Sequence, residues 1–470
     1  MSDSVPRPIL VLIASTLVLG ACSSSHTRSH LSRSELADDS WKEQAQWRGR
    51  DSINLAEFDR LVPADRVADR DFKRWVKQAG AGEPAILWRG RRPEDLFVSD
   101  TGTAIPVTRV GGEGASTIYD VLDRDSAIIA GKTEPLAANF TAPLAYLSDQ
   151  GDVKLPVIDA MIHNEKYFDE AGLYRFEPVD PERIPVLLIH GLKSSPTIWK
   201  IMVNQLRADP LVRKNYQFWS FSYPTGLPVL FSAMRLREEI VRMQKAYNPE
   251  GAHQRMNQMV IIGHSMGGLL TELQVKDSGY SFWPEDGPKI SSLDLPPEQE
   301  RQLTQAVFFA AIPQIRRAVF IATPHRGSDI AQSGIGRLID RVIQLPSDIT
   351  GVLVSVATLD PILGAADEKG RRQLPNSIDN LKPDSPFLKS LRALPFPSDL
   401  PIHSIIAIGE KPADPITSAN DGLVSYGSAH LDEAISEATV ASGHRAPNHP
   451  DAIREVARIL ALHLEKSRSR

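Results

Sequence analysis

The pattern with the clearest chemical meaning is a serine flanked by glycines, Gly263-His264-Ser265-Met266-Gly267. It follows a short apolar run, 259–262, and precedes a stretch of helical character, 269–273. In a strand–turn–helix of this kind the turn is so tight that the serine takes up a strained backbone conformation and its hydroxyl projects from the sheet. Glycines two residues before and after the serine permit that turn sterically. We therefore expect Ser265 to be a nucleophile.

A serine hydroxyl is a weak nucleophile at neutral pH, so it needs a histidine base and an acid that orients the histidine. With a serine in this kind of turn, the acid and then the histidine follow along the chain. Asp421 lies in a loop after an apolar run and is the expected acid, with Asp414 as the alternative. His444 follows the apolar segment 438–441 and precedes the last helical stretch, and it is the expected base.

Other histidines compete with His444 for the role of base. His449 stands between Asn448 and Pro450, where capping of a helix is the simpler role. His430 lies between the acid and the last strand and is expected at the surface. His190 precedes the nucleophile in the chain, and we expect it to shape its own loop.

The developing negative charge on a carbonyl oxygen needs donors, commonly the backbone N–H after the nucleophile and one from a loop after an early strand. The first of these is the N–H of Met266. The second lies in His190-Gly191-Leu192, directly after the apolar run 185–189. We assign it to Leu192, so that Leu192 and Met266 form the predicted oxyanion hole.

The elements that must position these residues alternate between short apolar runs and longer periodic stretches, as a parallel sheet with crossover helices requires. Residues 230–243 carry apolar side chains at near-helical spacing, and residues 453–464 form one apolar stripe of an amphipathic helix. The fold class is α/β. The expected strands are 185–189, 217–221, 259–262, 318–321 and 403–408.

Five motifs together resemble the lipase and esterase branch of the α/β-hydrolase superfamily, over about the last three fifths of the chain. They are His190-Gly191-Leu192, Gly263-His264-Ser265-Met266-Gly267, Ala322-Thr323-Pro324-His325-Arg326-Gly327-Ser328, Asp421-Gly422-Leu423-Val424 and Ser442-Gly443-His444. The resemblance implies an α/β-hydrolase fold with a mostly parallel sheet flanked by helices, and it makes His325 a structural residue of the pocket wall. It also implies cleavage of carboxylic esters by a Ser-His-Asp triad through an acyl-enzyme. An amidase, a peptidase, an acyltransferase or a non-catalytic envelope binding module are the alternatives.

An insertion at about 329–395 bears on the substrate. Within it, one stretch has the apolar spacing of an amphipathic helix, and a second apolar stretch runs from 349 to 359. The pair predicts either a helical lid that opens at a lipid surface or a fixed cap over the core, and both remain open. The apolar helix positions are Ile335, Leu338, Ile339, Val342 and Ile343.

The first 22 residues have the form of a secretion signal, with Arg7, an apolar run over 9–19 and then Gly20-Ala21-Cys22. Its end resembles a bacterial lipobox, so we expect Cys22 to carry acyl chains such as palmitate, while an ordinary signal or anchor is the alternative. Cys22 is also the only cysteine in the chain, which excludes an internal disulfide. Ser23 is compatible with sorting to the outer membrane, so the expected location is the bacterial cell envelope.

The remaining organisation follows from composition. We expect a flexible tether over 23–52, an accessory region over 53–160 and a catalytic domain over 161–470. The net charge of −5 arises from 53 basic and 58 acidic residues mixed along the chain, which disfavours nucleic-acid binding. No cofactor and no metal are expected, since acids and histidines show no ligand-type spacing beyond the triad. The expected partners are an ester or lipid substrate and the membrane that holds the lipid anchor.

Overall fold

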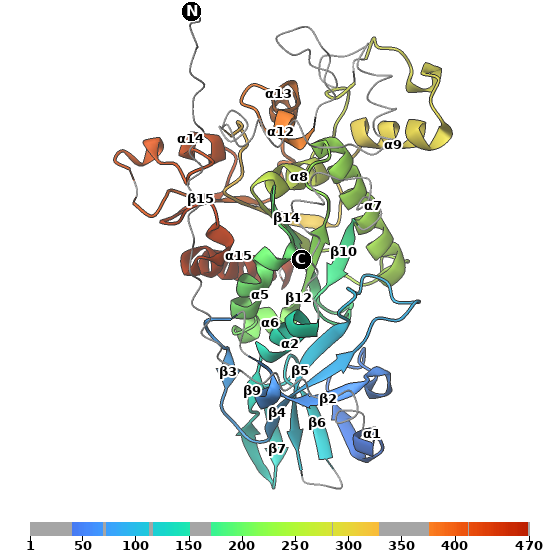
Figure 1. The fold of residues 1–470 in the computed structure, drawn as a ribbon, viewed down its shortest axis with the longest axis vertical. Coiled ribbons are helices and arrows are strands. Elements are labelled where there is room, and N and C mark those ends of the chain that lie inside the picture. The colour runs from blue at the N-terminus through green and yellow to red at the C-terminus, as the bar shows by residue number, and fades with distance from the viewer. Residues whose placement is uncertain are drawn as a thin grey trace, which may run out of the picture. The chain divides into compact units, whose positions relative to one another are not determined.

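The structure of the protein is a computed structural model. A seven-stranded sheet lies at the centre of its described part (Figure 1). The described residues are 40–68, 72–111, 116–150, 171–283, 285–328, 376–411 and 413–468. In sheet order the strands are β10 (Gly172–Arg175), β12 (Tyr216–Ser222), β11 (Ile184–Ile189), β13 (Met259–His264), β14 (Ile315–Ile321), β15 (Ile402–Ala407) and β16 (Ser436–Val440). β10 pairs antiparallel with β12, and the other neighbours are parallel. The mostly parallel sheet and the positions of its expected strands are confirmed.

Both faces of this sheet are buried, because alternate side chains of each strand enter two different hydrophobic cores. Along β11, Leu187 and Ile189 pack in one core, whereas Val186 and Leu188 pack in the other. All four side chains are fully buried. This explains why the strands were recognisable as continuous apolar runs rather than as alternating ones.

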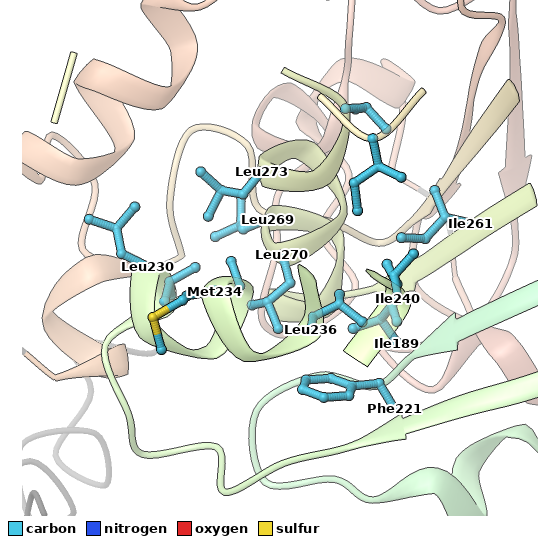
Figure 2. Packing of buried hydrophobic residues seen from close by; sticks show 14 of the residues in the cluster. Ile189, Phe221, Leu230, Met234, Leu236, Ile240, Ile261, Leu269, Leu270 and Leu273 are labelled. Atoms are coloured by element: carbon cyan, nitrogen blue, oxygen red, sulfur yellow. The ribbon is translucent and has the colours of Figure 1, made fainter. Parts of the chain in front are cut away.

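Helices cover each face. The first core receives α7 (Val229–Tyr247), α8 (Met266–Val275), α9 (Pro297–Val307) and α13 (Pro386–Ala393). The second receives α5 (Lys200–Leu206), α6 (Pro210–Asn215) and α15 (Pro450–Arg468). Figure 2 shows Leu230 and Met234 of α7 meeting Leu269 and Leu273 of α8 in the first core. The predicted helical stretches 230–243 and 453–464 are confirmed as parts of α7 and α15.

A second sheet of five strands lies N-terminal to the central sheet in the chain. Its order is β1 (Ala45–Arg48), β6 (Ser116–Asp120), β5 (Thr103–Val110), β4 (Glu83–Arg89) and β2 (Arg60–Pro63). It is accompanied by α1 (Ser40–Gln44), the pairs β3 (Lys77–Gln78) with β9 (Ala138–Asn139) and β7 (Ser126–Ile129) with β8 (Lys132–Pro135), and α2 (Ala142–Gln150).

The first strand of this sheet corrects the predicted tether over 23–52. β1 pairs in parallel with β6, and Trp47 packs against a core that includes Ile105 and Ile118. The local composition of 40–52 is polar, but long-range pairing and burial of Trp47 order it. Residues 40–52 are therefore not part of a flexible tether.

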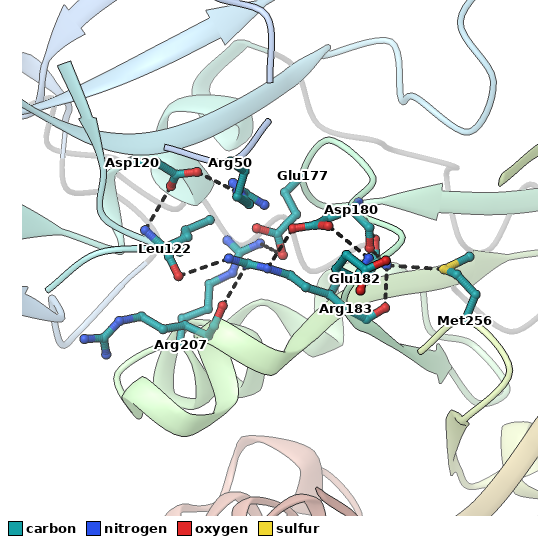
Figure 3. Close-up of polar contacts among 11 residues, drawn as sticks. Arg50, Asp120, Leu122, Glu177, Asp180, Glu182, Arg183, Arg207 and Met256 are labelled. Carbon is teal, nitrogen blue, oxygen red and sulfur yellow. Dashed lines mark hydrogen bonds and ion pairs between the residues drawn. The ribbon is translucent and has the colours of Figure 1, made fainter. Parts of the chain in front are cut away.

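Buried charges join the N-terminal sheet to the central sheet (Figure 3). Arg50 Nε donates to Asp120 Oδ2 at 2.6 Å within the N-terminal sheet region. Arg183, just before β11, donates to the carbonyl oxygen of Leu122 at 3.1 Å and forms an ion pair with Asp180 at 3.2 Å. These groups are almost fully buried, so removing one partner would leave an uncompensated charge and cost about 3–5 kcal/mol.

Several expectations fall outside the described residues. They are the signal segment 1–22 with Cys22, Ser23, most of the tether, and the part of the insertion over 329–375 that holds the expected lid helix. The described end of the insertion contains α12 (Ser377–Asn380) and α13. Within the described ranges no helix has both the length and the hydropathy needed to cross a membrane.

Candidate active site

Ser265 occupies a sharp turn between β13 and α8. Its backbone has φ 54° and ψ −129°, a conformation that non-glycine residues rarely adopt. Its N–H donates to the carbonyl of Ile321 at 2.9 Å, and its own carbonyl accepts from the N–H of Gly268 at 2.8 Å. These bonds hold the strained residue between two strands and the first turn of the helix, which is typical of a functional position.

The glycines around Ser265 are required by contact with neighbouring backbone. A Cβ on Gly267 would lie 2.3 Å from the carbonyl oxygen of Ile189, and a Cβ on Gly263 would lie 2.5 Å from the carbonyl oxygen of Gly267. Real Cβ atoms do not approach carbonyl oxygens so closely. The steric reason for the glycine spacing is therefore confirmed.

The structure brings the three predicted catalytic side chains into one hydrogen-bonded row. His444 Nδ1 lies 2.7 Å from Asp421 Oδ2, and His444 Nε2 lies 2.8 Å from Ser265 Oγ. A carboxylate only accepts, so Nδ1 carries the proton, and Nε2 is left to accept from the Ser265 hydroxyl. This is the tautomer that a general base for Ser265 needs.

Asp421 is fixed by its own turn. Its Oδ1 accepts from the N–H groups of Leu423 and Val424 at 2.8 and 2.7 Å, which leaves Oδ2 for His444. The Asp421 carbonyl also accepts from the backbone N–H of His444 at 3.1 Å. Asp414, the alternative acid, is exposed, and the imidazole is oriented by Asp421 instead.

The competing histidines lie elsewhere. His449 Nδ1 accepts from the N–H of Asp451 at 3.2 Å in the first turn of α15, so it caps that helix. His430 is half-exposed and contacts Glu437 and Asp432. His190 is fully buried and stacked on Tyr223 with ring centroids 4.5 Å apart, and burial lowers its pKa to about 4.

Two backbone amides, those of Leu192 and Met266, are expected to bind the oxyanion. Met266 is the first residue of α8, where the N–H has no partner inside the helix and the helix dipole is positive. Leu192 follows β11 and lines the same cavity as Ser265. Within the described residues neither N–H donates a hydrogen bond, so both are free to bind a ligand. Their role stays a prediction.

His264 was quoted in the serine motif but given no role. Its Nε2 lies 2.8 Å from the carbonyl oxygen of His444, which can only accept, so Nε2 carries a proton. Burial, with the nearby charge of His444, lowers the pKa of His264 to about 3, and the ring is neutral. His264 therefore ties the backbone of the base to the nucleophile turn. Only the residue type was visible in the sequence, because its partner lies 180 positions away.

His325 belongs to a buried charged cluster behind the nucleophile helix. Glu272 of α8 contacts His325 Nδ1 at 2.5 Å through one oxygen and Lys276 Nζ at 2.7 Å through the other. Burial alone would raise the pKa of Glu272, but Lys276 and His325 lower it to about 2. The i, i+4 spacing of Glu272 and Lys276 was the available sequence signal for this pair.

A cavity of about 240 Å³ opens over Ser265 and His444. Its apolar lining includes Leu192, Ile198, Leu381, Leu423 and Val424. Apolar walls beside a nucleophile suit the acyl chain of an ester. In the described part of the chain no group of three or more His, Cys, Asp or Glu is arranged to hold a metal ion.

Comparison with known proteins finds a similarity in the central region of the chain. Residues 181–344 match a family described as "Putative serine esterase (DUF676)", and this range contains β11 to β14 and Ser265. No curated protein matches the sequence.

Solved structures that resemble the chain include hydrolases. The mature lipase BlEst2 from Bacillus licheniformis aligns with a TM-score of 0.37 and 16% identity over 61% of this chain and 97% of its own. The metagenomic carboxyl esterase MGS0156 aligns with a TM-score of 0.34 and 16% identity over 66% of this chain and 90% of its own.

The family match and the architecture agree. A parallel sheet with helices on both faces, and a strained serine between β13 and α8, surround the matched residues. The matched segment is therefore similar to a family of serine esterases, and the described part of the chain has an α/β fold.

Proposed function

We propose that this enzyme cleaves esters through an acyl-enzyme on Ser265, with His444 as general base and acid and Asp421 as the group that orients His444. The observation that carries the proposal is the row of hydrogen bonds Asp421–His444–Ser265, at 2.7 and 2.8 Å. Its donor and acceptor order matches the direction in which a proton must leave the serine.

In the first half of the reaction, Ser265 Oγ attacks the ester carbonyl carbon while its proton moves to His444 Nε2. The carbonyl oxygen becomes negatively charged and accepts from the N–H groups of Leu192 and Met266. The intermediate collapses when the bond to the alcohol oxygen breaks, and His444 gives that oxygen the proton. The alcohol leaves, and the acyl group remains on Ser265.

The second half repeats these roles with water. His444 takes a proton from water as its oxygen attacks the acyl carbon, and then returns a proton to Ser265 Oγ as the acid departs. One ester and one water thus give one carboxylic acid and one alcohol. His444 ends in its starting tautomer, still bonded to Asp421.

The test is a comparison of single variants on a short soluble p-nitrophenyl ester. Ser265→Ala and His444→Ala should lower kcat by a factor on the order of 10⁶, as for other triad residues. His449→Ala serves as the matched histidine control and should keep near-parental kcat, because its ring caps α15. Near-parental turnover in Ser265→Ala would remove the proposal, and loss of activity in His449→Ala alone would reassign the base.

We further propose that the enzyme is held at a bacterial envelope membrane, with an outer-membrane location, by acyl chains on Cys22. The support is the apolar run that ends in Leu19-Gly20-Ala21-Cys22, together with the absence of any other cysteine from the sequence. Buried methylenes of attached acyl chains supply the membrane affinity. An enzyme tethered there would meet lipid esters at the membrane surface.

A further inference from the structure

Two cationic side chains line the cavity beside Ser265, and both directly follow residues of the proposed machinery. Lys193 comes after Leu192, whose N–H is an expected oxyanion donor. Arg445 comes after His444, which returns the proton to the leaving alcohol. The described lining contains no carboxylate. A charged group of a bound ester would therefore meet positive charge only.

Neither cation has a partner among the residues that the structure describes. Among the described residues no side-chain hydrogen bond or ion pair engages Lys193 or Arg445, and burial without a compensating charge lowers the pKa of Lys193. Asp421 is the nearby acid of the site, but His444 occupies its Oδ2, and the N–H groups of Leu423 and Val424 occupy its Oδ1. Both oxygens of Asp421 are thus already bonded within the site, and neither bonds Lys193 or Arg445.

Other basic residues near the site are paired. Arg326 donates to the carbonyl of Gly427 at 3.0 Å, and Lys276 forms a buried ion pair with Glu272 at 2.7 Å. A half-buried lysine without a partner is costly by comparison, since desolvation disfavours its charged form. Lys193 and Arg445 therefore differ from these neighbours, because no described residue pairs with their side chains.

The backbone of Lys193 adds a second and independent observation. Its φ is 52°, in the left-handed region that favours glycine, and its N–H is held by Thr225 Oγ1 at 3.3 Å. A glycine would occupy this position without strain. Strain of this kind persists where the surrounding structure holds it, and such positions cluster at ligand-binding sites. At this position the strained conformation is occupied by a lysine, whose side chain lines the cavity, instead of by a glycine, which has no side chain.

We infer that the ester substrate carries an anionic group on its alcohol portion, a phosphate or a carboxylate, and that Lys193 and Arg445 bind it. The alcohol side follows from Arg445, which adjoins the histidine that protonates the leaving oxygen. The apolar lining then receives the acyl chain. This inference rests on the proposed function and adds the substrate class to it.

The test uses three soluble esters with the same hexanoyl group, below the concentration at which they aggregate. They are 1-hexanoylglycerol, 1-hexanoylglycerol 3-phosphate and 3-hexanoylglycerate, which are neutral, phosphate-bearing and carboxylate-bearing. The full-length enzyme should show a kcat/KM at least about a hundredfold higher for one or both anionic esters, since each cation should contribute about tenfold or more. The anionic ester with the higher value identifies the group that the site binds.

Variants then assign the preference to the two side chains. Lys193→Gln and Arg445→Gln should each lower the ratio of anionic to neutral kcat/KM by roughly ten- to a hundredfold, the range for one hydrogen bond to a charged group. Lys193→Gly should lower the ratio equally, and because glycine accepts the positive φ it guards against misfolding. Lys132→Gln, an exposed lysine on β8, is the control and should keep the parental ratio.

Each outcome is decisive. A parental enzyme with equal kcat/KM for all three esters overturns the inference, as does a preference that survives loss of both cations. If 1-hexanoylglycerol is cleaved without any preference, only the substrate class is wrong. If none of the three esters is cleaved, the proposed function fails together with the inference.

Discussion

Gly191 is the position where one added methyl group should most directly separate activity from folding. A Cβ at this residue would lie 2.7 Å from Ser265 Cβ, 3.0 Å from the carbonyl oxygen of His264 and 3.2 Å from Ser265 Oγ. These neighbours are held by the β13–α8 turn, so the loop that carries Leu192 must move instead. The N–H of Leu192 would then move away from the position in which it is expected to bind the carbonyl oxygen of the ester.

The expected loss follows from two effects of Gly191→Ala. Overpacking of a tight site costs about 1–3 kcal/mol of stability. Displacement of one oxyanion donor costs about 10²–10³ in kcat, the size seen when such a donor is removed. We therefore expect a folded enzyme with a slightly lower Tm and a kcat reduced by two to three orders of magnitude, roughly.

The assay is kcat and KM on a soluble p-nitrophenyl ester, with Tm measured on the same samples. Gly427→Ala is the matched control, because a Cβ there meets nothing within 4 Å. It should leave kcat and Tm near the parental values. If Gly191→Ala turns over at the parental rate, the loop is not constrained by Ser265, and Leu192 is not an oxyanion donor.

Other predictions concern the acid, the buried charges and the anchor. Asp421→Asn should lower kcat by about 10⁴, since the imidazole loses the acceptor that sets its tautomer; steady-state kinetics with unchanged circular dichroism would check this. Burial lowers the pKa of His403 to about 3 and the pKa of His463 to about 4. Below pH 6.5 these two histidines are therefore protonated in the unfolded chain but remain neutral in the folded protein. Stability to urea should therefore fall as the pH drops from about 6.5 to about 4, by about 1.4 kcal/mol per pH unit for each histidine, and a flat profile would contradict this. Glu272→Gln should destabilise the fold by about 3–5 kcal/mol in urea unfolding, because its buried lysine partner loses its counter-charge. Cys22→Ser should move the protein from the membrane to the soluble fraction, and membrane retention with unchanged lipid labelling would refute the anchor.

The central sheet was predictable because its strands are buried on both faces. Runs such as 185–189 and 259–262 are continuously apolar, without alternating polar residues, and each is followed by a periodic helical stretch. The N-terminal sheet was not predictable in the same way. Its first strand, Ala45–Arg48, is short and polar, and it is ordered by pairing with β6 about 70 residues away.

In the candidate active site, too, local patterns were predictable and long-range contacts were not. Local pattern identified Ser265, and the order of acid and base along the chain pointed to Asp421 and His444. The bond from His264 to the carbonyl of His444 depends on a fold-level approach that no local pattern contains. The positive φ of Lys193 could not be predicted from the sequence either, because lysine is not a residue type that favours a left-handed backbone conformation.

The most direct measurement is to trap the covalent intermediate. The enzyme is mixed with p-nitrophenyl hexanoate, quenched in acid during turnover and digested, and the peptides are analysed by mass spectrometry. The account predicts a hexanoyl adduct on the peptide that contains Ser265, a burst of about one p-nitrophenol per enzyme when acylation outpaces deacylation, and neither in Ser265→Ala. Steady turnover with the adduct on another residue, or an adduct that persists in Ser265→Ala, would contradict it.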